Sequence, residues 1–359
     1  MPTPTPPSPA VPASGVPGQG TVGTLFMVAL VLAMLLMLPA GPQAGPYSAL
    51  ATIFASIVLE ALPFMLLGSL VGGLIEAFVS RERLASLLPR SPLAAVCAAA
   101  AMGFVFPVCE CAVVPVVRRL VGKGLPFPAA VAYLLAGPIV NPIVAGSTLL
   151  AYGFDWSVAG LRLGLGYVVA VAAALIMGRL FPGRTALRDG DVGLHAPSCA
   201  CGCGASLKPF SEVADAVRPA DLATRLQQAL RHGAADFLGV GHYLVIGAFV
   251  AALAQTFVNR SLLLDMIESP MLSIALMSGL AVALNLCSEA DAFIASSFRG
   301  IMPMPAQMAF MLTGPMFDLK LLLMYQVVFR KPAILALSAL VLLFTAAASA
   351  VLAYGVTPW

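Results

Sequence analysis

Charged side chains are scarce in this sequence: Asp, Glu, Lys and Arg make up 10% of its 359 residues, whereas 60% are hydrophobic. A soluble domain usually carries roughly a quarter charged residues. The composition therefore excludes a soluble globular protein and predicts an all-α integral membrane protein surrounded by lipid. The net charge of +3 is small and spread over loops, so we expect no nucleic-acid partner.

Several chemical signatures are also missing. The chain has no Walker-A sequence, so a transporter of this kind would draw energy from an ion gradient or a separate partner. Seven cysteines in a long membrane chain do not form the dense disulfide framework of a small secreted protein, and none of them forms a Cys-x-x-Cys pair. We expect no enzyme and no obligatory cofactor.

What the chain does contain is a series of long apolar runs. A membrane-spanning helix needs about 20 apolar residues, and about seven runs qualify. They are Thr21–Ala40, Tyr47–Val79, Pro126–Tyr152, Trp156–Phe181, Gly233–Val258, Pro303–Phe329 and Pro332–Tyr354. Two further stretches, Pro92–Val117 and Pro270–Phe298, carry prolines or polar residues and are expected to be broken or re-entrant.

These runs organise the chain into four parts. Residues 1–20 are proline-rich and uncharged, which predicts a disordered tail. Residues 21–181 form a first membrane repeat with an extra N-terminal helix, and 232–359 form a second. Between them, 182–231 is less hydrophobic and more charged, which predicts a soluble linker that ends in an amphipathic helix.

The two membrane parts resemble each other in sequence. "PFPAAVAYLLAGPIVN" at 126–141 returns as "PMPAQMAFMLTGPMFD" at 303–318, and "FVSR" at 78–81 returns as "FVNR" at 257–260. Two matches in the same order indicate an internal duplication, which is typical of secondary transporters. If 92–117 re-enters, most Lys and Arg residues share one side with the linker. The positive-inside rule then favours inverted repeats and a cytoplasmic linker.

The stretch "FPVCECAVVP" places Glu110 between Cys109 and Cys111 inside an apolar segment. A charge near the bilayer centre costs about 2.5–3.5 kcal/mol, so Glu110 must face a partner or a cavity. It is either a structural carboxylate that pairs with a nearby arginine or a proton or cation site. The thiols are either small hydrophobic groups or soft-metal ligands, and they share one cavity only if the backbone there is not helical.

The second half carries a similar group of polar residues in "NLCSEADAF", where a carboxylate-and-thiol site competes with a polar loop at the membrane surface. Its candidate residues are Asn285, Cys287, Glu289 and Asp291. Asn141 and Asp318 each follow a Gly-Pro pair, where an unwound helix can expose oxygen ligands; the alternative is a plain proline kink. We expect these residues, with Cys109, Glu110 and Cys111, to line a transport pathway.

The linker contains "HAPSCACGCG", in which His195 precedes Cys199, Cys201 and Cys203. Three close thiolates suit copper(I) or zinc, with the histidine as an extra ligand, whereas the alternative is a flexible loop with incidental cysteines. We expect a soft metal ion to bind here.

"FPVCECAVVPVVRRLVGKGLP", "GPIVNPIV" and the later "GPMFD" together resemble the ArsP/YraQ-type predicted permease family, over about residue 47 to the C-terminus. The resemblance implies a bacterial inner-membrane permease, with members linked to export of trivalent organoarsenicals and others to copper or zinc efflux. It places Cys109, Glu110, Cys111, Asn141, Cys287 and Asp318 on the pathway.

We therefore expect a secondary-type permease that exports a soft metal, a metalloid or a thiol-metal complex. A membrane thiol oxidoreductase and a metal-sensing membrane protein are the alternatives. A homo-oligomer is left open.

Overall fold

The structure, a computed structural model, describes residues 46–78, 89, 91–182, 185–187, 222–257 and 269–355. Within these ranges the regular structure is helical, apart from an isolated β-bridge between Leu187 and Phe329. The predicted all-helical class is therefore confirmed. The candidate helix Thr21–Ala40 and the linker residues predicted to bind a metal, His195, Cys199, Cys201 and Cys203, lie outside the described residues.

The helices follow one another in this order: α2 (Pro46–Phe78), α4 (Pro92–Val105), α5 (Glu110–Gly122), α6 (Phe127–Ala136), α7 (Pro142–Ala151), α8 (Trp156–Leu180), α10 (Leu222–Phe257), α11 (Pro270–Leu284), α12 (Ser288–Ser297), α13 (Met304–Met316), α14 (Leu319–Met324), the 3-10 turn η2 (Tyr325–Val327) and α15 (Lys331–Gly355). Helix α10 begins inside the range that the sequence assigns to the linker and continues without interruption through the apolar run.

Five described segments are long and apolar enough to cross a membrane. They are Ala49–Ile75, Trp156–Leu180, Leu226–Thr256, Met304–Val327 and Lys331–Gly355. Each matches one of the predicted runs. The run at Pro126–Tyr152 is instead divided into the shorter helices α6 and α7.

Helix breaks are the feature that shapes the interior. Helix α4 stops before Phe106–Cys109 and α5 starts after it, which is where the sequence places the irregular backbone. Helices α11 and α12 are separated by Asn285–Cys287. Similar interruptions lie between α6 and α7 and, at Phe317–Asp318, between α13 and α14. The breaks leave several helix N-termini inside the protein.

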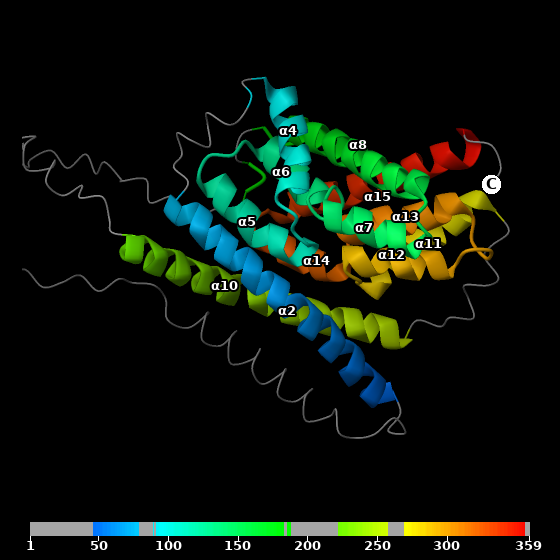
Figure 1. Cartoon of the computed structure of the whole chain (residues 1–359), viewed down its shortest axis with the longest axis horizontal. Coiled ribbons are helices and arrows are strands. Elements are labelled where there is room, and N and C mark those ends of the chain that lie inside the picture. The colour runs from blue at the N-terminus through cyan, green and yellow to red at the C-terminus, as the bar shows by residue number, and fades with distance from the viewer. Residues whose placement is uncertain are drawn as a thin grey trace, which may run out of the picture.

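Helix ends gather at two opposite ends of the bundle (Figure 1). At one, the Phe127 end, the rings of Phe127 and Phe329 pack edge to face with their centroids 5.8 Å apart. At the other, the Tyr152 end, the guanidinium of Arg299 lies 5.1 Å from the centroid of the Tyr152 ring. Helix α5 runs from the centre toward the Phe127 end and α12 runs toward the Tyr152 end.

Helices α2 and α10 lie side by side along one flank of the bundle (Figure 1). Each approaches the first turn of a broken helix through a glycine: Gly68 of α2 faces Ala112 of α5, and Gly247 of α10 faces Lys320 of α14. A β-carbon on Gly68 would stand 2.6 Å from Ala112 Cα. Small residues permit this close approach of helices, which fixes the helix starts in place.

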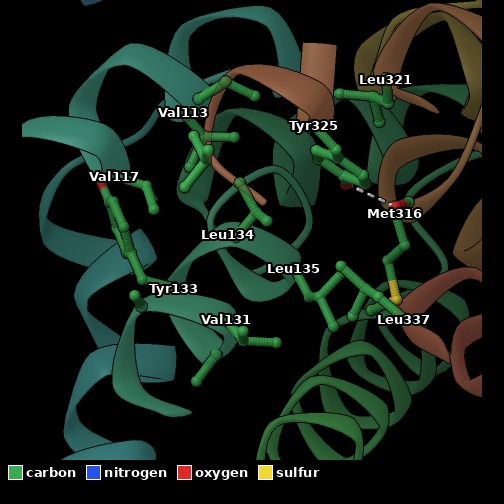
Figure 2. Close-up of a cluster of buried hydrophobic side chains, with 14 of the residues drawn as sticks. Val113, Val117, Val131, Tyr133, Leu134, Leu135, Met316, Leu321, Tyr325 and Leu337 are labelled. Carbon is green, nitrogen blue, oxygen red and sulfur yellow. Dashed lines mark hydrogen bonds between the residues drawn. The ribbon is translucent and has the colours of Figure 1, made fainter. Parts of the chain in front are cut away.

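A buried apolar cluster joins the two halves of the chain (Figure 2). Its members include Val113 of α5, Leu135 of α6, Met316 of α13, Tyr325 of η2 and Leu337 of α15. The Tyr325 hydroxyl donates a hydrogen bond to the Met316 carbonyl at 2.8 Å. The two halves therefore share one core around the helix breaks.

Candidate functional site

A buried ion-pair centre lies where the breaks meet. The Nζ atom of Lys320 is 3.3 Å from Oε1 of Glu110 and 3.6 Å from Oδ2 of Asp318, and all three side chains are at most 3% exposed. Charges removed from water are stable only when they are paired. Glu110 therefore has a cross-bundle partner, Lys320, instead of the neighbouring arginines that the sequence suggested.

Those two arginines have a separate partner. The Arg119 Nε atom donates to Asp236 Oδ2 at 2.5 Å, and Arg118 Nη1 is 3.6 Å from Asp236 Oδ1. This pairing ties the last turns of α5 to α10 near the Phe127 end. The two arginines are therefore paired with Asp236, and the Glu110 carboxylate is paired with Lys320.

Local backbone geometry places the two carboxylates. Glu110 is the first residue of α5, directly after the extended Cys109, and Asp318 is the N-cap of α14. The Oδ1 atom of Asp318 accepts from the Leu321 backbone N–H at 2.5 Å. Helix N-termini carry partial positive charge, so a carboxylate at each is electrostatically favoured.

Asn285 links a third break to the same centre. Its backbone is left-handed (φ 48°), a conformation that Asn adopts more readily than most residues. Its Oδ1 accepts from the Lys320 backbone N–H at 2.9 Å, and its Nδ2 donates to the Val282 carbonyl at 2.8 Å. The α11–α12 break therefore holds the backbone of Lys320 in place.

Three thiols lie beside the ion pairs. Cys109, Cys111 and Cys287 line a small pocket with Glu60, Glu110 and Lys320. The accessible space measures about 10 Å³, roughly the room for one water molecule. Within the described ranges, no group of three or more His, Cys, Asp or Glu side chains is arranged to hold a metal ion.

A second polar centre surrounds Arg162 of α8, which is fully buried. Its Nη1 donates to Thr148 Oγ1 at 2.9 Å and its Nη2 to the Ser288 carbonyl at 2.7 Å. Asp291 of α12 acts on it electrostatically, and Glu289 acts more weakly. The Arg162 Nε and the Asp291 Oδ2 have no hydrogen-bond partner, although both are buried.

The predicted pathway residues lie in three places: around Lys320, near Arg162, and at the start of α7. Those that gather around Lys320 are Cys109, Glu110, Cys111, Asn285, Cys287 and Asp318. Glu289 and Asp291 lie on the first turns of α12, close to Arg162.

Asn141 has a local role at the start of α7. Its Oδ1 accepts from the Val144 backbone N–H at 2.8 Å and its Nδ2 donates to the Gly137 carbonyl at 3.1 Å. Asn141 and Asp318 occupy matching positions in the two repeated sequence motifs, and both are N-caps that follow a Gly-Pro pair.

Sequence reasoning missed Lys320, Arg162 and Glu60. Each is an ionisable residue inside an apolar run, which is a functional signal in itself. Motif spacing drew attention to the cysteine-rich and duplicated segments instead. A scan for every charge within the predicted spans would have found all three.

A larger pocket of about 500 Å³ lies at the Tyr152 end, between the α7–α8 corner and the α12–α13 corner. Tyr152 donates from its hydroxyl to Gln307 Oε1 at 2.8 Å, and Gln307 Nε2 donates to the Met302 carbonyl at 2.8 Å. Arg299 and Asp155 also line it. The pKa of Asp155 is lowered, first by the hydrogen bond from the Ser157 hydroxyl.

Long apolar helices, broken helices and charges buried where they break are typical of a membrane permease. The chain belongs to the ArsP_1 family of predicted permeases, which it matches over residues 47–354. It is 40% identical to the UPF0718 protein YcgR of Bacillus subtilis over 280 residues, 78% of this chain and 88% of that protein. No solved structure matches it.

A second relative comes from Streptococcus mutans and is named a putative two-component membrane permease complex subunit. The two chains are 33% identical over 283 residues, which is 79% of this chain and 88% of that protein. The resemblance noted in the sequence is therefore confirmed at the level of the family.

Proposed function

We propose that this chain is a secondary-type permease that exports a soft metal cation, a metalloid or a thiol-metal complex through the centre around Lys320. The observation that supports it most directly is the meeting of Glu110, Asp318 and three thiols at helix breaks from both halves of the chain. Thiols select soft cations, and carboxylates compensate their charge.

We propose that the membrane part consists of two inverted repeats. Helices α2, α4, α5, α6, α7 and α8 have counterparts of similar order in α10, α11, α12, α13, α14 and α15. The opposite directions of α5 and α12 support the inversion (Figure 1). In this arrangement α4–α5 and α11–α12 re-enter from opposite sides.

The Phe127 end would then face the cytoplasm. Among the described residues, most positive charges outside the centre lie there: Arg118, Arg119, Lys123, Arg179, Arg330 and Lys331. The positive-inside rule assigns such an end to the cytoplasm. The linker follows α8 at this end and would be cytoplasmic in a bacterial inner membrane. The pocket at the Tyr152 end would face outward, as an exit vestibule.

We also propose a partner subunit, by extension from the relative named as part of a two-component complex. Co-purification from the native host with a tagged chain tests this. Recovery of this chain alone, under conditions that retain other membrane complexes, would contradict it.

The central experiment compares export by single variants at matched membrane expression. Cells that carry Glu110→Gln, Cys109→Ser or Cys111→Ser should accumulate zinc, copper or arsenic and lose resistance to it. Cys97→Ser is the matched thiol control, since Cys97 lies half-buried on α4, where its carbonyl accepts a hydrogen bond from the Tyr167 hydroxyl.

The pattern of loss identifies the cargo. Loss in the thiol variants alone would indicate a neutral thiol-reactive cargo, such as an organoarsenical. Loss of export in both the thiol variants and Glu110→Gln would indicate that the cargo is a cation. Unchanged export in all three variants would place the pathway elsewhere, and Glu289→Gln would then test the second half.

A further inference from the structure

The backbone of Lys320 is fixed from three directions. Its N–H donates to Asn285 Oδ1 at 2.9 Å, its helix is capped by Asp318, and Gly247 of α10 packs directly on its Cα. Its ammonium group, by contrast, lies at the end of a flexible four-carbon stem. The distances of 3.3 and 3.6 Å to the two carboxylates are those of ion pairs, not of short hydrogen bonds.

Glu110 keeps unused binding capacity. Its Oε1 faces the Lys320 ammonium, whereas its buried Oε2 has no hydrogen-bond partner. Asp318 uses both oxygens, because Oδ1 accepts from the Leu321 N–H and Oδ2 lies 3.6 Å from Lys320 Nζ. Glu110 lines the same pocket as the thiols of Cys109 and Cys111, and this set of groups suits a soft cation.

We propose that Lys320 is an internal cation that occupies the carboxylates between transport events, and that a cargo cation binds Glu110 by displacing its ammonium. This inference rests on the proposed function and adds the step that empties and refills the site. Two positive charges cannot share Glu110 in a buried site without strong repulsion. The fixed backbone and flexible stem let the ammonium withdraw while the helix stays in place.

Displacement makes cargo binding reversible. A site with two carboxylates and no resident cation would hold a soft cation tightly and release it slowly. With Lys320 present, the ammonium competes for the same oxygens and drives the cargo off. Lys320 is therefore a residue that tunes affinity, distinct from the groups that contact the cargo.

The test uses the full-length protein with Cys199, Cys201 and Cys203 changed to Ser, so that linker thiols do not contribute. Cd²⁺ is the probe, followed by its thiolate-to-metal absorption. In this background Lys320→Met should bind Cd²⁺ about tenfold more tightly or better, because the competing charge is gone. Lys320→Arg keeps the charge and should stay within about threefold of the parent.

If Lys320→Met does not fold, the Cd²⁺ affinity of the charge-balanced double variant Asp318→Asn/Lys320→Met is compared with that of Asp318→Asn alone. The double variant should bind Cd²⁺ more tightly, because Glu110 is then free. If the folded variant that lacks Lys320 binds Cd²⁺ no more tightly than its reference protein, the displacement is overturned.

Export in cells separates the two proposals. Tighter Cd²⁺ binding by the variant, with no export by the parent chain, would overturn the proposed function and keep the displacement. Export by the parent with no tightening in the variants would overturn the displacement alone.

Discussion

Gly247 of α10 lies so close to α14 that a β-carbon on it would stand 2.9 Å from the Cα of Lys320 and 3.4 Å from the Lys320 carbonyl oxygen. Both atoms belong to the backbone, so the clash cannot be relieved by rotation of a side chain. The position of the buried lysine therefore depends on the absence of a side chain on a neighbouring helix.

Gly247→Ala should displace the start of α14 and lower the free energy of unfolding by about 1–3 kcal/mol, the usual cost of overpacking. Export should fall with it, because the ammonium moves relative to Glu110. Thermal unfolding in detergent and export from cells measure the two effects. Gly279→Ala is the control, since a β-carbon there meets open space. Equal behaviour of the two variants would refute the packing argument.

The sequence predicts the helical class and most apolar spans because the length of an apolar run is enough to identify a helix that can cross the bilayer. Breaks were also predictable where proline or polar residues interrupt an apolar run, as at Phe106–Cys109 and Asn285–Cys287. The helix expected at the end of the linker and the apolar run after it form one continuous helix, α10, since a helix can pass from polar to apolar sequence without a break.

Long-range partners could not be predicted from local pattern. Glu110 and Lys320 are 210 positions apart, and only the folded chain brings them within 3.3 Å. The same holds for Arg162, whose hydrogen-bond partners lie on α7 and at the start of α12. The thiols and carboxylates themselves were recognisable, because such groups are costly in an apolar segment.

The linker prediction is independent of the membrane part. Cys199, Cys201 and Cys203 should bind copper(I) or zinc, which thiolate-to-metal absorption of the purified protein would show. Their triple serine variant should bind less metal, keeping only what the thiols of the membrane part hold, while its thermal unfolding stays unchanged in metal-free buffer. Equal metal content in the two proteins would rule out the linker site.

The proposed topology predicts which side each loop faces. Single cysteines at Ser86, Gly122 and Ser206, introduced one at a time into a cysteine-free chain, should all react with a membrane-impermeant maleimide only after the cells are opened. The reason is that a re-entrant α4–α5 segment returns to the side from which it started. Labelling of Gly122→Cys in intact cells, with Ser86→Cys protected, would mean that this segment crosses the membrane once.

Arg162 and Asp291 supply the last prediction. Removing the guanidinium by Arg162→Met leaves the buried Asp291 without its main compensating charge and the Ser288 carbonyl without its donor. Breaking a buried charge interaction in this way costs about 3–5 kcal/mol, so a large fall in thermal stability is expected. Arg179→Met is the matched control, because Arg179 lies exposed in the last turn of the same helix.

The double variant Arg162→Met/Asp291→Asn removes both charges. It should recover part of the lost stability, since the uncompensated carboxylate is gone while the lost hydrogen bonds remain lost. The effects of the two substitutions should therefore be non-additive, as expected for groups that share one buried network. Additive effects would mean that Arg162 acts only through Thr148 and Ser288, and that Asp291 is held by other groups.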